Sequence, residues 1–156
     1  MNQKFVERIA NGVAEIFKTL MDVNVSLDTI ATQKHLRIDG LAAIISILSH
    51  YHCTILLSVS DEMAIAITNR LGVKVDVVNE IVHDAIMELV NIIAGRIKTD
   101  LYCDGKPAKL GLPTIIEGEY SVTFPKDATW TIASFMSSLG SFELQLLMKE
   151  DLKCKH

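Results

Sequence analysis

The sequence predicts an α+β fold in which two long helices pack on one face of a largely antiparallel β-sheet. Amphipathic helical segments alternate with groups of short segments whose apolar residues have strand-like spacing. Short connections between such segments favour helices packed on one side of an antiparallel sheet. With 156 residues, 49% of them apolar, the chain is expected to form a single domain over residues 1–150, followed by a short tail of residues 151–156.

The first half of the chain is expected to begin with a helix over residues 5–21, where apolar residues recur at helical spacing. A short helix is expected to follow Ser60, a residue type that caps helix N-termini, and to end near Leu71, before Gly72. The alternating and apolar segments between these helices predict three strands, over residues 23–30, 35–49 and 53–59.

The second half is expected to begin with the longer of the two main helices, from about Val77 to about Leu101. A turn is expected over residues 104–107, which contain glycine and proline, and a hairpin loop over residues 137–141. The segments around them predict four further strands, over residues 110–117, 120–124, 129–136 and 142–148.

The predicted long helix carries a polar stripe opposite its aliphatic face. Residues spaced three or four apart share one face of a helix, and Asp84, Glu88, Asn91 and Gly95 have this spacing. A glycine in the interior of an exposed helix costs about 1 kcal/mol relative to alanine, and it permits close approach of another backbone. The stripe is therefore a candidate contact surface, although a Glu-x-x-Asn pair is very common and spacing alone favours a solvated face.

The two long helices also align with one another, and both are followed by strands, which suggests a possible internal pseudo-repeat of one helix-plus-strands unit. The alternative is that any two amphipathic helices align this well. The aligned pairs are Asn11 with Asp84, Glu15 with Glu88, Lys18 with Asn91 and Asp22 with Gly95.

Composition and charge exclude several classes of function. The net charge is −4 and the 15 basic residues are scattered, so no nucleic-acid partner is expected. The longest apolar run, residues 41–48, is too short to span a bilayer, and the chain begins without a secretory signal pattern. Three cysteines, Cys53, Cys103 and Cys154, without a C-x-x-C pair suit a reducing compartment, so a cytoplasmic location is expected.

Few other residues suggest chemistry. His50, His52 and Cys53 form the one metal-like cluster, but no second pair of ligands accompanies them, so no metal site is expected in this chain. Cys103 has no activating neighbour in the sequence that would make it a nucleophile. His83 flanks the polar stripe and is expected to be a partly buried surface residue.

The stripe and its flanking sequences resemble the CheC/CheX/FliY group of chemotaxis phosphatases, and CheX in particular. The pattern Asp84-x-x-x-Glu88-x-x-Asn91-x-x-x-Gly95 is similar to the signature of that group. Three further segments look like their CheX counterparts in the same order, namely residues 5–21, 56–64 and 111–118. One intact motif, on the second long helix, is typical of CheX rather than of CheC, which often has two.

The resemblance implies a CheC/CheX-like fold and a phosphatase of two-component signalling, a hydrolase that removes the aspartyl phosphate of a CheY-type response regulator. It implies that Asn91 orients the attacking water, that Glu88 contacts a lysine of the regulator, and that Asp84 and Gly95 take part in partner binding. It also implies that the metal is the Mg²⁺ of the regulator, that this chain has no cofactor, and that the protein is a homodimer.

Two other interpretations remain open. The chain could be a non-catalytic dimeric module that docks a response regulator or another signalling protein without hydrolysis. It could also be a structural adaptor whose stripe is only solvated. For a homodimer, the apolar strand over residues 41–48 is a candidate pairing edge.

Overall fold

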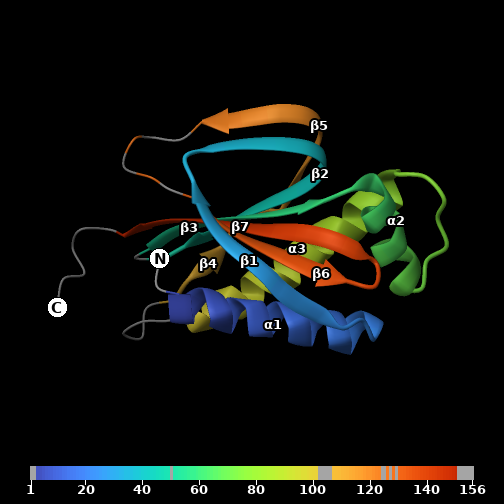
Figure 1. Ribbon diagram of the computed structural model, residues 1–156, viewed down its shortest axis with the longest axis horizontal. Coiled ribbons are helices and arrows are strands. Elements are labelled where there is room, and N and C mark those ends of the chain that lie inside the picture. Colours follow the sequence, from blue (N-terminus) through green and yellow to red (C-terminus); the bar gives the residue numbers. More distant parts are fainter. Residues whose placement is uncertain are drawn as a thin grey trace.

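The computed structural model describes residues 3–49, 51–101, 107–123, 126, 128 and 130–150. It contains a large antiparallel sheet with helices packed against one face (Figure 1). The elements are, in chain order, α1 (Gln3–Met21), β1 (Val25–Gln33), β2 (His35–Leu48), β3 (Tyr51–Val59), α2 (Asp61–Arg70), α3 (Glu80–Asp100), β4 (Lys109–Leu110), β5 (Thr114–Thr123), β6 (Trp130–Ser137) and β7 (Gly140–Glu150). The predicted α+β class, with two long helices on one face, is confirmed.

The strand order of the sheet is symmetric about its centre. Strands β1, β6, β7, β3 and β2 lie side by side in that order, and β2 pairs on its other side with β4 and β5. All pairings are antiparallel. The order β1-β6-β7-β3-β2-β5 is unchanged when it is read backwards with β1 exchanged for β5, β2 for β6 and β3 for β7. This symmetry supports the pseudo-repeat suggested by the sequence.

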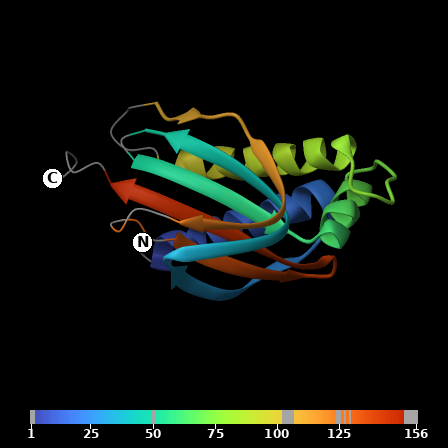
Figure 2. The same cartoon turned by 90° about the horizontal axis from the view of Figure 1, so that it is seen from above.

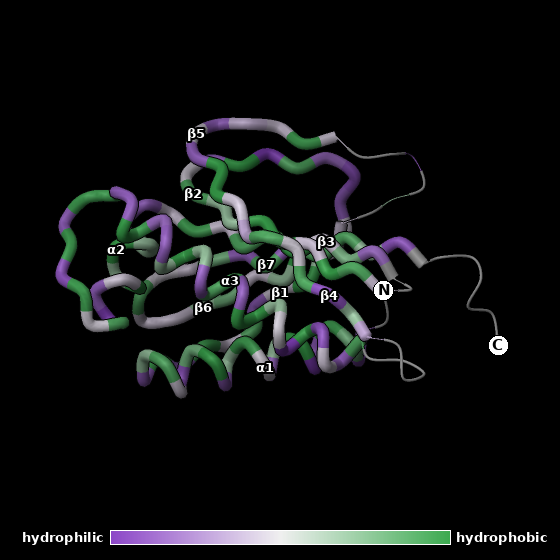
Figure 3. Tube along the Cα trace, turned by 180° about the vertical axis from the view of Figure 1, so that it is seen from behind, coloured by the Kyte–Doolittle hydropathy of each residue, from purple (hydrophilic) through white to green (hydrophobic). Residues whose placement is uncertain are grey.

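The main hydrophobic core lies between the sheet and the two long helices. Apolar residues of α1 and α3 pack there against alternate residues of β2, β3, β6 and β7. At its centre Phe142 stacks between Phe17 of α1 and Phe135 of β6, with ring centroids 4.9 and 4.8 Å apart. Hydrophobic and hydrophilic segments alternate along α1, as its amphipathic spacing predicts (Figure 3). None of the helices among the described residues is long and apolar enough to cross a membrane.

A second, smaller core lies on the other face of the sheet. Strand β2 bends at Gly40, whose φ is +111° and where an added Cβ would lie 3.0 Å from the carbonyl oxygen of Val59. Gly40 pairs with Gly118 of β5, which also has positive φ. Beyond this glycine pair, β5 and the adjoining part of β2 stand above the rest of the sheet (Figures 1 and 2). The buried residues on this side are Leu36, Ile38, Ala42, Leu56, Trp130 and Ile132.

Most predicted element boundaries are confirmed to within a few residues, but two predicted strands are wrong. Residues 110–117 and 120–124 are not separate strands, because β5 runs through Gly118 without a break. The interruption falls earlier, where Leu110 pairs with Ile47 and Thr114 with Ile44. The stretch between them holds one residue more than the facing stretch of β2, so the chain forms a bulge there.

The proposed pairing edge over residues 41–48 is also wrong. This part of β2 pairs with β3 on one side and with β4 and β5 on the other, so its backbone groups are already bonded. The sheet ends instead at β1 and, on the other side, at β4 and β5. His50, Cys103, the tail over 151–156 and most of the turn predicted over 104–107 lie outside the described residues.

Candidate functional site

Helix α3 is capped at its N-terminus and packs one face in the core. The side chain of Asn79 accepts hydrogen bonds from the backbone N–H groups of Ile81 and Val82, at 3.0 and 3.2 Å, and so caps the helix. The helix therefore begins at Glu80, three residues later than the sequence predicts. Seven residues of α3 are buried in the core, namely Val82, Ile86, Leu89, Val90, Ile93, Ala94 and Ile97. The opposite face is left for contact with solvent or a partner.

The structure places the four predicted site residues on that outer face. Asp84 and Glu88 are exposed, and Asn91 is half-buried. Among the described residues, no hydrogen bond or ion pair engages the side chain of any of these three. An amide and a carboxylate one helical turn apart are therefore free to bind the same external group.

Gly95 adds an open area to the same face. A Cβ added at this position would have no heavy atom within 4 Å outside its own helix. Its backbone conformation is helical, because Gly95 is absent from the positive-φ glycines of the chain. Neither lack of space nor backbone conformation in the isolated protein requires a glycine here, which leaves close approach of another molecule as a physical reason for it.

One border of the stripe is formed by α1. Arg96 of α3 forms an ion pair with Glu15 of α1 at 3.1 Å, and the two helices are joined again by Arg8 and Asp100 at 3.8 Å. The aliphatic part of Arg96 crosses α1 at Gly12, where an added Cβ would lie 3.1 Å from its Cγ. This cross-brace joins α3 to α1 at their exposed surfaces.

The other border is formed by β5. His83 of α3 lies with its Nε2 3.4 Å from a carboxylate oxygen of Glu117, and its side chain is 27% exposed, so the predicted partial burial is confirmed. The same nitrogen is buried without a hydrogen-bond partner of good geometry. We regard the pair as a close contact rather than a hydrogen bond, because the distance is longer than hydrogen bonds to a carboxylate usually are.

The face of α1 that aligns with the stripe differs in one decisive respect. Glu15, the counterpart of Glu88, is held by Arg96. Lys18, the counterpart of Asn91, forms a hydrogen bond and ion pair with Asp22, and this contact lowers the pKa of the Asp22 carboxyl. Asp22, the counterpart of Gly95, has φ +53° and follows the last residue of the helix. Glu15, Lys18 and Asp22 are thus paired within the protein, whereas Asp84, Glu88 and Asn91 have no such partner among the described residues.

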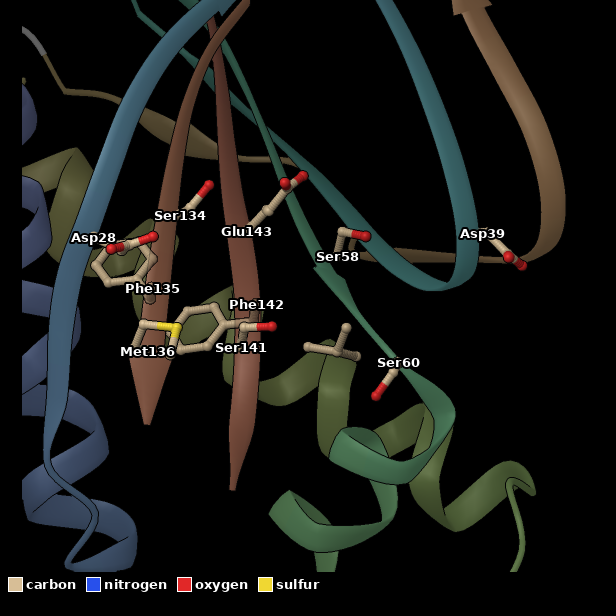
Figure 4. Close-up of a pocket in the computed structure, with 11 residues that line it drawn as sticks. Asp28, Asp39, Ser58, Ser60, Ser134, Phe135, Met136, Ser141, Phe142 and Glu143 are labelled. Atoms are coloured by element: carbon tan, nitrogen blue, oxygen red, sulfur yellow. The ribbon is translucent and has the colours of Figure 1, made fainter. Parts of the chain in front are cut away.

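A cavity of about 410 Å³ lies elsewhere, on the sheet face opposite the helices (Figure 4). Asp28, Asp39 and Glu143 contribute carboxylates to its lining, and none of the four stripe residues lines it. Asp28 and Asp39 lie at opposite sides of it (Figure 4). Among the described residues, no group of three or more His, Cys, Asp or Glu side chains could hold a metal ion.

Cys53 is also unsuited to chemistry. It is buried in the core, and desolvation by burial raises the pKa of its thiol to about 12. A thiol with so high a pKa is not a nucleophile at neutral pH.

Sequence reasoning missed the brace between α1 and α3. It aligned Glu15 with Glu88 but indicated no partner for it, whereas the structure pairs it with Arg96. The available signal was the arginine next to Gly95 together with the small residue Gly12 in α1. Such a signal is weak, because surface ion pairs between helices have no fixed spacing.

Known structures define the class of fold. The structure is similar to CheX from Desulfovibrio desulfuricans, with a TM-score of 0.80 and 15% identity over 94% of this chain and 99% of that one. It is similar to CheX from Vibrio vulnificus, with a TM-score of 0.79 and 18% identity over 94% and 99% of the two chains. It is also similar to a chain of the CheX–CheY–BeF3–Mg²⁺ complex from Borrelia burgdorferi, with a TM-score of 0.75 and 18% identity over 94% and 98%. The fold is therefore CheC/CheX-like.

The sequence itself identifies the family. The family model for chemotaxis phosphatase CheX matches residues 41–136, which are more than half of the chain. This chain belongs to the CheX family. No functionally curated protein matches the sequence.

Proposed function

We propose that this protein accelerates hydrolysis of the aspartyl phosphate of a CheY-type response regulator. The observation that carries the proposal is the outer face of α3, where Glu88 and Asn91 lie one turn apart without partners among the described residues. The family, and the presence of CheY beside CheX in the Borrelia burgdorferi complex, support a regulator as the partner.

Asn91 is assigned the role of orienting the attacking water. The carboxamide both donates and accepts hydrogen bonds, so it can hold a water in line with the phosphorus atom without removing a proton from it. The water oxygen forms the new bond to phosphorus as the bond to the aspartyl oxygen breaks, which releases inorganic phosphate and the free carboxylate. Positioning of the water supplies most of the rate acceleration for such an activated phosphate. Asn91 is half-buried, so its carboxamide can reach a partner at the surface.

The other stripe residues are assigned to binding. Glu88 is exposed and unpaired, so its carboxylate is available to a lysine ammonium of the regulator. Asp84 extends the acidic surface by one turn, and Gly95 leaves room for the regulator backbone. We assign the Mg²⁺ of the reaction to the regulator, as the resemblance to the CheX family implies. Mg²⁺ is present in the Borrelia burgdorferi complex.

The matched test is the rate of phosphate release from phosphorylated regulators of the same organism, with and without the protein. Asn91→Ala should lower the acceleration by about 10²–10³-fold, the usual effect of losing one positioning group. Asn11→Ala is the control, because Asn11 is also an amide on a long helix, but it is exposed and lies on α1. Equal acceleration by Asn91→Ala and the unmodified protein would refute the assignment.

Binding without hydrolysis is the alternative outcome of the same experiment. If the protein binds a phosphorylated regulator yet accelerates phosphate release from none, it is a docking module that has lost its activity.

We further propose a homodimer, for which strand β1 is a suitable pairing element because it ends the sheet and most of its residues are exposed. Sedimentation equilibrium at micromolar concentration checks this, and a monomer mass would refute it.

A further inference from the structure

Exposed aliphatic side chains lie immediately before the stripe of α3. Val77 is 58% exposed and Ile81 is 49% exposed. Ile81 stands one turn before Asp84 and two turns before Glu88, at spacings of three and seven residues, so it borders the stripe on the helix surface. Hydrophobic stretches alternate with hydrophilic ones along the connection between α2 and α3 that contains Val77 (Figure 3).

The connection that presents Val77 is fixed in place. Asn69 of α2 accepts a hydrogen bond from the N–H of Val75 at 2.8 Å and donates one to its carbonyl oxygen at 3.1 Å. Val75 and Val78 pack against the main core, and Asn79 caps α3. Because its neighbours are anchored on both sides, the exposed side chain of Val77 is held on the surface. A preordered apolar surface loses little conformational entropy when a partner covers it.

The usual area of a stable protein–protein interface indicates how far from the stripe a bound partner extends. A partner that covers about 800 Å² of this protein has a footprint of about 16 Å radius. Ile81 lies about 13 Å along the helix axis from the middle of the stripe, at about 1.5 Å per residue. A regulator centred on Glu88 and Asn91 therefore also covers Ile81, and Val77 precedes Ile81 by only four residues in the chain.

We propose that Val77 and Ile81 form the apolar part of the surface that docks the phosphorylated regulator, against an apolar patch that borders its phosphorylated aspartate. This inference rests on the proposed function. In this arrangement the aliphatic side chains supply affinity at the edge of the site, and the polar stripe supplies the chemistry. Their contribution is to binding and not to the step at phosphorus.

The test uses Val77→Ser and Ile81→Gln, singly and together, with the regulator whose dephosphorylation the unmodified protein accelerates most. The double variant should raise KM, and the Kd for the beryllofluoride-bound regulator, by about tenfold, while kcat at saturation stays unchanged. Met136→Gln is the matched control, since Met136 is 52% exposed and lines the cavity on the sheet face opposite the helices. Both altered side chains are exposed, so the circular dichroism spectrum and Tm should stay close to those of the unmodified protein.

The outcomes separate this inference from the proposed function. Lack of acceleration by the unmodified protein refutes the phosphatase assignment, and the Kd comparison then decides the docking inference alone. Unchanged KM and Kd in the double variant refute the docking inference while leaving the phosphatase assignment intact. A change in oligomeric mass on substitution, with unchanged Kd, shows that the patch joins two copies of this chain and also refutes it.

Discussion

Replacing Gly95 with alanine should stabilise the isolated protein and weaken its reaction with the regulator. The residue is helical, and the added methyl group would have no neighbour within 4 Å beyond its own helix. A glycine in the helix interior is about 1 kcal/mol less favourable than alanine, so the free energy of unfolding should rise by about that amount. For a chain of this length such a gain raises Tm by roughly 2–4 °C.

The same methyl group should impair docking. If the regulator backbone packs against Gly95, an added carbon overfills the contact at a cost of about 1–3 kcal/mol. A cost near the lower half of that range raises KM by about tenfold. Calorimetric unfolding of the free protein and phosphate-release kinetics with the regulator measure the two effects separately.

Gly12→Ala is the internal control for the stability measurement. Gly12 is also helical, but an added Cβ would lie 3.1 Å from Cγ of Arg96, so the side chain that pairs with Glu15 would have to shift by a few tenths of an ångström. The gain from alanine should therefore be largely cancelled, leaving Tm nearly unchanged. If Gly95→Ala lowers Tm, the conclusion that the space around Gly95 is open in the isolated protein is refuted. If it raises Tm and leaves KM unchanged, the reasoning about close approach is refuted.

Two further predictions concern titratable groups. Cys53 should not react with thiol reagents at pH 8 until the protein unfolds, because its thiol is buried and burial raises its pKa to about 12. The measurement uses a Cys103→Ser/Cys154→Ser variant, in which Cys53 is the remaining cysteine. Labelling of the native variant at the rate of a free thiol would contradict the prediction. Lys18 lowers the pKa of Asp22 below 3.8, so the carboxylate stabilises the fold above pH 3.8 and this contribution is lost as the pH falls through the folded-state pKa. Denaturant unfolding of Asp22→Asn should therefore differ from that of the unmodified protein at neutral pH and converge with it in acid, and a constant difference at all pH values would argue against the assignment.

The fold was largely predictable because its signals are local. The amphipathic spacing of α1 and the side chain of Ser60, which accepts a hydrogen bond from the N–H of Met63 at 3.1 Å, depend only on residues close in sequence. The start of α3 was misplaced because Val77 and Val78 continue the apolar spacing, although Asn79 is the cap. The joined strand through Gly118 was missed because a glycine signals a turn locally, and only its pairing with Gly40 shows a continuous bend.

The candidate site was predictable only in part. Helical spacing alone places Asp84, Glu88, Asn91 and Gly95 on one face, and the structure agrees. That their polar side chains lack internal partners depends on which residues of α1 and β5 lie nearby, and spacing carries no such information. The pairing of Glu15 with Arg96 joins residues that are far apart in the chain, so it emerges only from the packed helices.

The symmetric strand order has a consequence for stoichiometry. A scaffold with two equivalent halves offers two equivalent helix positions, and two working faces would let one chain hold two regulators at once. Here the α1 face is consumed by internal ion pairs through Glu15, Lys18 and Asp22, so one chain should saturate with one regulator. Exchanging Lys18 for asparagine and Asp22 for glycine would not by itself create a second binding position, since Arg96 would still hold Glu15.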